Sequence, residues 1–145
     1  MSLPRRRDVL LALAVVGVGI ATYLTYVHYA QIEPICTTGG CETVQSSRYA
    51  TLGGIPIAVF GLGMYLAIVA LLVARRTERW RDVPLFAAWT FLLALGGVLY
   101  SAYLTYLELR VIHAICTWCV ASAITVTLIC VLSAPDVRRA PAGRG

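Results

Sequence analysis

The sequence Cys116-Thr117-Trp118-Cys119 stands where a short polar stretch gives way to a long apolar one. Two thiols at this spacing can close a small disulfide ring and open it again, which is the minimum needed for two-electron thiol chemistry. Residues 111–135, which contain the motif, include no Asp, Glu, Lys or Arg. A helix of about 20 such residues can cross the hydrocarbon layer of a membrane. The motif therefore lies at the start of a predicted membrane-spanning helix.

Three other stretches share this character, namely residues 9–30, 49–74 and 83–107. The 145-residue chain is 59% hydrophobic and only 13% charged, which is typical of a membrane protein. We expect an all-α membrane protein whose single domain, residues 1–135, is a four-transmembrane-helix bundle. Residues 136–145, which include Pro141 and Gly143, are expected to form a disordered cytoplasmic tail.

The basic residues divide unequally between the two ends of this bundle. Ten of the 12 precede the first stretch, separate the second from the third, or follow the fourth, and only Arg48 and Arg110 fall at the other end. The positive-inside rule then predicts a multi-pass membrane protein with both termini in the cytoplasm. We interpret the net charge of +5 as a topology signal, so membrane lipid is an expected partner and nucleic acid is not. Four cysteines then fall at the outer face, where disulfides persist: Cys36, Cys41, Cys116 and Cys119.

An arginine run before the first apolar stretch, Arg5 to Arg7, is also found in signal peptides and twin-arginine signals. A retained helix is favoured because residues 9–30 are longer than a typical signal core and their pattern recurs. A shift of 80 residues superposes Tyr23-Leu24-Thr25-Tyr26 on Tyr103-Leu104-Thr105-Tyr106 and Cys36 on Cys116. Either a parallel repeat or convergent use of interfacial tyrosines explains this match.

The loop at residues 31–54 is long for a small helical bundle and is therefore a functional candidate. Pro34 and the Gly39-Gly40 pair break regular structure around Cys36 and Cys41. Residues 42–49 contain no such breaker, so we expect a short helix there along the membrane surface.

Thiol–disulfide exchange between a mobile loop pair, Cys36 and Cys41, and a fixed helical pair, Cys116 and Cys119, would make an electron relay. The positive end of a helix stabilises a thiolate, the attacking form of the sulfur. The expected electron acceptor is a lipid-soluble quinone held among the helices. Alternatives are a purely structural Cys36–Cys41 bridge, or a structural zinc site made of all four cysteines. Cys130 is expected to be a packing residue.

The loop C-x4-C, Ser46-Ser47-Arg48-Tyr49, Gly54-Ile55-Pro56 and the final C-x-x-C together resemble vitamin K epoxide reductase and its bacterial homologues. The resemblance covers nearly the whole chain, residues 9–133, and implies a four-helix bundle around a quinone. It implies that Cys119 lies closest to the quinone, that Cys41 attacks Cys116, and that Cys36 exchanges with an outside partner. Ser47 matches the loop serine or threonine that shapes the site in this family.

This sequence departs from the animal enzymes at two places. Residues 54–65 hold no evident counterpart of the amide that contacts vitamin K, and Ala123 replaces a tyrosine four residues after the second active cysteine. These departures favour the bacterial role, which is to reoxidise a separate, thioredoxin-like periplasmic oxidoreductase. The acceptor would be menaquinone, ubiquinone or a vitamin K type quinone. From position alone, the expected pocket residues are Phe60, Met64, Val120 and Ala123.

The first hypothesis is therefore a quinone-linked disulfide oxidoreductase, and it assigns no metal ligands. A second hypothesis, of another class, is a cysteine-ligated metal-binding or structural membrane protein, which stoichiometric zinc would support. The proton donor is left open among His113, Glu108 and water.

Overall fold

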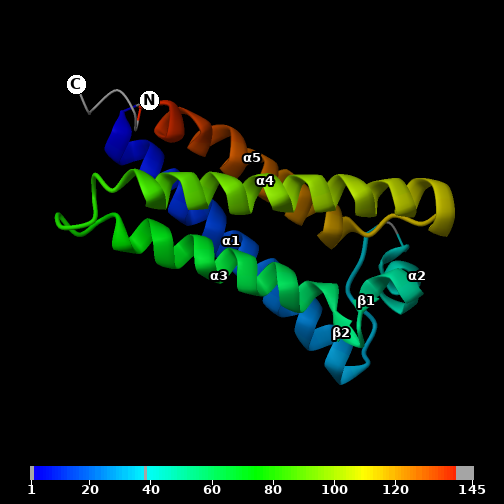
Figure 1. The fold of residues 1–145 in the computed structure, drawn as a ribbon. Coiled ribbons are helices and arrows are strands. Elements are labelled where there is room, and N and C mark those ends of the chain that lie inside the picture. The colour runs from blue at the N-terminus through cyan, green and yellow to red at the C-terminus, as the bar shows by residue number, and fades with distance from the viewer. Residues whose placement is uncertain (1, 38, 140–145) are drawn as a thin grey trace.

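The computed structural model describes residues 2–37 and 39–139. Four long helices run the length of the molecule (Figure 1): α1 (Leu3–Ala30), α3 (Ile57–Ala74), α4 (Pro84–Leu107) and α5 (Thr117–Arg139). Each is long and apolar enough to cross a membrane, alone or, for α4, together with the turn that follows it. The predicted all-α bundle of four transmembrane helices is confirmed.

Prolines mark the start of two of these helices, and a left-handed residue follows the end of one of them. Pro4 lies in the first turn of α1 and Pro84 opens α4, positions where the missing N–H has no intrahelical partner to lose. α1 ends at Ala30, and the next residue, Gln31, has a left-handed backbone (φ 54°) and donates its N–H to the carbonyl of His28. Each helix therefore stops close to the ends of the apolar stretches.

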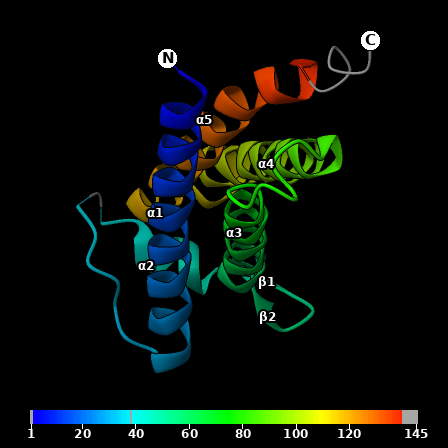
Figure 2. The same ribbon diagram turned by 90° about the vertical axis from the view of Figure 1, so that its left-hand side faces the viewer.

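The four helices pack in a ring, because α1 contacts α3 and α5, and α4 contacts α5 and α3. Figure 2 views this arrangement with α1 in front. The buried core between the helices consists of Leu10, Ala14, Ala21, Tyr65, Ile68, Leu72, Ala94, Val126 and Ile129.

One close contact in this core joins three helices. The ring of Tyr65 lies directly on Gly17, where an added Cβ would overlap the ring atoms. Its hydroxyl donates to the carbonyl oxygen of Ser122 at 3.0 Å. Glycine is therefore needed at position 17 for α1 to approach α3, and Tyr65 also ties α3 to α5.

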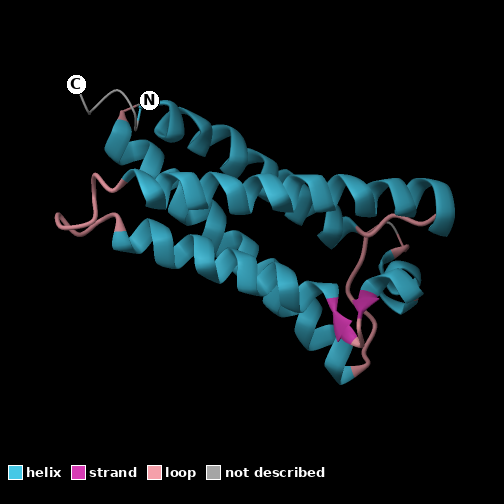
Figure 3. Cartoon of the chain, in the orientation of Figure 1, coloured by secondary structure: helices cyan, strands magenta, loops and turns pink. Residues whose placement is uncertain are grey.

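The loop between α1 and α3 covers one end of the bundle. It contains α2 (Cys41–Ser46), the 3₁₀ turn η1 (Arg48–Ala50) and a small antiparallel hairpin of β1 (Thr51–Leu52) and β2 (Ile55–Pro56), drawn in magenta in Figure 3. Gly53 and Gly54 turn the hairpin with φ of 61° and 85°. The single short helix expected at residues 42–49 is divided in two, because Ser47 adopts an extended backbone (φ −68°, ψ 153°).

At the opposite end, the predicted boundary of the tail is wrong for residues 136–139. α5 continues through Pro135 to Arg139. Asp136 is buried there and pairs with Arg6 of α1 and with Arg75, 3.1 Å away, at the end of α3. These two ion pairs hold the last turn of α5 in the bundle despite the proline. Residues 140–145, the rest of the expected tail, lie outside the described residues.

Candidate active site

Both predicted cysteine pairs lie at the end of the bundle that the loop covers. Cys36 and Cys41 are joined in a disulfide, whereas Cys116 and Cys119 are thiols. Cys41 and Cys116 are fully buried and lie with Val44 in one apolar cluster, against which Cys36 and Cys119 pack. The two pairs therefore meet through Cys41 and Cys116.

The loop segment around Cys36 is held by aromatic side chains from two helices. The backbone N–H of Ile35 donates to the hydroxyl of Tyr23 at 3.0 Å, and Trp118 Nε1 donates to the Ile35 carbonyl at 2.6 Å. The rings of Tyr23 and Trp118 are themselves in contact, with centroids 4.7 Å apart. Cys36 Sγ lies 3.6 Å from Thr117 Oγ1. The segment thus rests on α1 and on the first turn of α5.

A glycine brings the start of α2 close to the irregular segment that precedes α5. A Cβ on Gly40 would lie 2.5 Å from the carbonyl oxygen and 2.7 Å from the nitrogen of Ile115. Because both atoms belong to the backbone, they cannot rotate away. Gly40 therefore permits the backbone contact that places Cys41 beside Cys116.

The thiol of Cys116 sits at the N-terminus of α5. The backbone carbonyl of Cys116 accepts the first helical hydrogen bond, from the N–H of Val120. The Sγ of Cys116 accepts the backbone N–H of Cys119 at 3.4 Å. The Cys119 thiol also donates to this sulfur. These hydrogen bonds, the one from the Cys119 thiol above all, lower the pKa of Cys116 from 9.0 to about 7, although burial opposes the shift. Cys116 is therefore poised as the thiolate of the pair.

A buried carboxyl lies behind both thiols. Glu108, only 4% exposed, accepts the N–H of Cys116 at 3.2 Å, and its carboxyl is a second acceptor within reach of the Cys119 S–H. It opens η2 (Glu108–Ile112), a π-helical turn, and its own carbonyl accepts the N–H of Ala114. Such turns are rare and occur often at functional sites. Of the three proton donors left open by the sequence, Glu108 is placed against the thiols.

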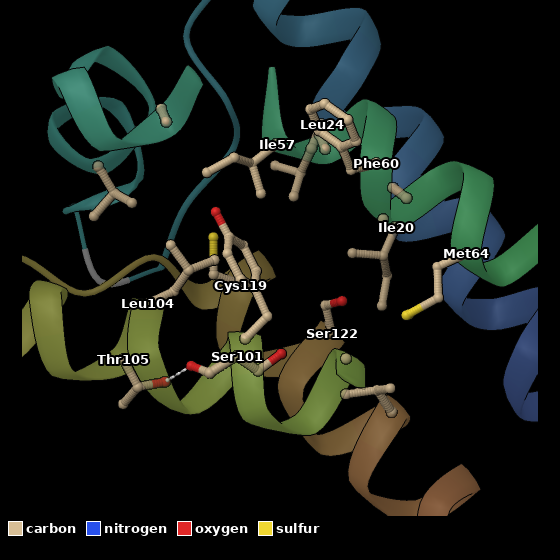
Figure 4. Close-up of a pocket in the computed structure, with 18 of the residues that line it drawn as sticks. Ile20, Leu24, Ile57, Phe60, Met64, Ser101, Leu104, Thr105, Cys119 and Ser122 are labelled. Carbon is tan, nitrogen blue, oxygen red and sulfur yellow. Dashed lines mark hydrogen bonds between the residues drawn. The ribbon is translucent and has the colours of Figure 1, made fainter. Parts of the chain in front are cut away.

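From Cys119 a cavity of about 400 Å³ extends between the helices. Figure 4 shows Cys119 and Ser122 of α5 on one side of the space, and Ile57, Phe60 and Met64 of α3 on the other. Much of its wall is apolar, and the polar residues that line it are Gln45, Ser47, Tyr49, Tyr65, Tyr100, Ser101, Thr105, Glu108 and Ser122.

Three predicted pocket residues, Ser47, Phe60 and Met64, line this cavity. Val120 and Ala123 do not, so the prediction that they line it is wrong. Since a helix turns by 100° per residue, the stripe that faces the cavity consists of Cys119 and the positions three and seven residues after it, Ser122 and Val126. Val120 and Ala123 each follow a residue of this stripe directly, so their side chains are rotated about 100° away from the cavity.

Gln45 contributes to the site but carries no motif in the sequence. Its Nε2 lies 4.0 Å from Cys119 Sγ. The one feature of the sequence that could have indicated this contact is the position of Gln45, four residues after Cys41. Cys130, by contrast, packs against the central core, the role expected of it.

The cavity fits a quinone in volume and chemistry. Small-molecule sites enclose about 300–1,000 Å³ and combine apolar walls with a few polar groups. Here an apolar wall surrounds Cys119, a redox-competent sulfur. A metal fits the same residues less well, because two of the four cysteines are joined to each other. Within residues 2–37 and 39–139, no group of three or more His, Cys, Asp or Glu has the arrangement of a metal site.

Comparison with known proteins agrees with this arrangement. Over 127 residues the chain is 31% identical to the thiol-disulfide oxidoreductase LTO1 of Arabidopsis thaliana. This match covers 80% of the chain and 32% of the plant protein, so the chain spans about a third of that relative's length. Residues 9–134 match the vitamin K epoxide reductase family across all four helices and both cysteine pairs. The chain belongs to the vitamin K epoxide reductase family.

Proposed function

We propose that the protein is a membrane thiol–disulfide oxidoreductase that passes electrons from an external dithiol through two cysteine pairs to a quinone. The observation that carries this proposal is the meeting of Cys41 and Cys116 in one buried cluster, with Cys119 on the wall of the cavity. Family membership and the name of the plant relative support the same chemistry.

In the proposed cycle the loop pair is reduced first. A partner thiolate attacks Cys36, which is half-buried, whereas Cys41 is fully buried, and the Cys41 thiolate leaves. The second thiolate of the partner then attacks the partner sulfur bound to Cys36, which leaves the partner as a disulfide and releases Cys36 as a thiolate. The Cys41 thiolate then attacks Cys116 in the Cys116–Cys119 disulfide, and the Cys119 sulfur leaves. Cys36 next attacks Cys41, which restores the loop disulfide and releases Cys116. The loop disulfide and inner dithiol of this structure are the state expected after that exchange.

The inner pair is then reoxidised at the cavity. A bound quinone supplies an acceptor for two electrons and two protons. Cys119 Sγ faces the acceptor, and Cys116, as a thiolate, closes the disulfide onto Cys119. Ser47, whose hydroxyl donates to the carbonyl of Val44 at 2.7 Å, fixes the end of α2 at the cavity wall.

The site is proposed to lie on the outer face of a bacterial inner membrane, with both ends of the chain in the cytoplasm. Within residues 2–37 and 39–139, nine arginines gather at the end opposite the cysteines, which supports this orientation. The proposed electron donor is a separate, thioredoxin-like periplasmic oxidoreductase. Menaquinone, ubiquinone or a vitamin K type quinone would serve as acceptor.

Quinone reduction by a reduced thioredoxin-like protein tests this proposal. The purified full chain is expected to reduce the quinone, as followed by its absorbance, and Cys119→Ala is expected to abolish the reaction. Cys130→Ala, which removes a thiol outside the relay, should leave the rate unchanged. Persistent turnover in Cys119→Ala would contradict the relay.

A further inference from the structure

Glu108 differs from the other acidic residues near the cysteines in its burial and in its partners. It is 4% exposed, whereas Glu33 and Glu42 are exposed at the same end of the molecule. Among the described residues its carboxyl joins no ion pair, since the three salt bridges involve only Asp8 and Asp136 as acids. An ionisable side chain within a membrane-spanning region, bonded to a reacting group, indicates a functional role.

The geometry around the carboxyl is that of a proton acceptor for Cys119. The single S–H of Cys119 has two acceptors within reach, Cys116 Sγ and the Glu108 carboxyl, while the Cys116 N–H, 3.2 Å from Oε2, holds that carboxyl in place. Glu108 also lines the cavity. A proton on Cys119 thus has a short path to a carboxylate beside the space assigned to the acceptor.

We propose that Glu108 is the catalytic base that takes the proton of Cys119 when the inner dithiol is oxidised, an inference that rests on the proposed function. Closing the Cys116–Cys119 bond removes two electrons and leaves two protons to be placed. The electrons go to the quinone. The Cys119 proton goes to Glu108, and Cys116 has already released its proton as a thiolate. Glu108 then passes its proton to the reduced quinone, and water, which took the proton that Cys116 released earlier, supplies the second proton of the quinol.

Glu108→Gln separates this chemistry from a structural role. The glutamine oxygen can still accept the Cys116 N–H, but the amide cannot take a proton. In a single turnover of the prereduced protein with a quinone, we expect oxidation to slow by about 100-fold or more, the scale of general base catalysis. Glu42→Gln, the same substitution on an exposed carboxylate, should react at the wild-type rate.

Glu108→Ala provides a second readout, because added formate can enter the space and act as a base. We expect formate to restore part of the single-turnover rate in this variant and to leave the wild type unchanged. A near wild-type rate in Glu108→Gln would overturn the inference alone, as would a slow Glu108→Ala that formate does not accelerate. Absence of quinone reduction in the wild type would overturn the proposed function and, with it, this inference.

Discussion

Cys116 combines three features that a relay cysteine needs. It is buried beside Cys41, it lies at a helix N-terminus, and it accepts hydrogen bonds from both the thiol and the backbone N–H of Cys119. Hydrogen bonds to a thiolate stabilise the charged form even where burial opposes it. A C-x-x-C motif alone suggests this chemistry, but the pKa depends on contacts that only the folded chain defines.

We expect the thiolate of Cys116 to form as pH rises through about 7. Because its pKa is lowered, the thiolate predominates above this pH and is lost below it. Titration of the thiolate ultraviolet absorbance in the reduced protein checks this, with Cys116→Ser as the variant that should lose the transition. Cys119→Ala removes the main hydrogen-bond donor and should move the transition to higher pH. An unshifted transition there would contradict the assigned cause.

Gly40→Ala tests the backbone contact that brings the pairs together. The new methyl would meet the Ile115 backbone and push α2 and Cys41 away from Cys116. A displacement of about 1 Å can slow a positioned reaction by about 10- to 100-fold. We expect quinone reduction by the thioredoxin-like donor to fall by an amount in this range. Gly63→Ala, where the methyl enters open space, should keep the wild-type rate.

At the scale of elements, α5 organises the site. The inner cysteine pair lies at its start, and Cys119 and Ser122 face the cavity. The carbonyl of Ser122 also accepts a hydrogen bond from the Tyr65 hydroxyl. The helix is positioned by α1 and α3 through the contact between Tyr65 and Gly17. The geometry of the redox end therefore depends on packing in the middle of the bundle.

Gly17→Ala should destabilise the bundle by about 1–3 kcal/mol, the usual cost of overpacking a core. The reason is that the added methyl overlaps the ring of the buried Tyr65. Thermal unfolding in detergent measures the effect. Gly19→Ala, on the same helix but facing open space, is the matched control and should unfold at or above the wild-type temperature. Equal unfolding temperatures for the two variants would contradict the described packing.

Charge-free stretches and the resemblance predicted the four helices, the loop and the cysteine pairs. The hydrophobic pattern could not predict the cavity wall, since membrane helices are apolar on faces toward lipid and toward the core alike. Distance along the chain from Cys119 favours Val120 and Ala123, whereas the helical stripe that faces the cavity runs through Ser122. Gln45 and Gly40 act through contacts between distant segments, with Cys119 and Ile115 respectively.

On the scale of the whole molecule, the two ends differ in chemistry. One end holds the cysteines and the cavity, and the other holds the buried cluster of Arg6, Arg75 and Asp136, which joins α1, α3 and α5. The sequence pattern does not predict this cluster, because Asp136 is charged and lies in a segment expected to be disordered. Its role is in holding the helices together, far from the redox chemistry.

Asp136→Asn should destabilise the protein by about 3–5 kcal/mol, because it leaves two buried guanidinium groups without their carboxylate. Asp8→Asn breaks the exposed pair with Arg76 and should cost less than about 1 kcal/mol. Thermal unfolding of both variants in the same detergent compares them directly. Similar unfolding temperatures would contradict the assignment of the cluster as a buried link between helices.

The central claim, that electrons pass between the pairs through Cys41 and Cys116, can be tested by trapping that bond. In the double variant Cys36→Ala, Cys119→Ala, the two remaining relay cysteines have no other partner within the relay. After mild oxidation, mass spectrometry of the unreduced digest is predicted to find a peptide pair joined through Cys41 and Cys116. Free Cys41 and Cys116 in a folded protein, or a bond to Cys130 or to a second chain in its place, would contradict the account.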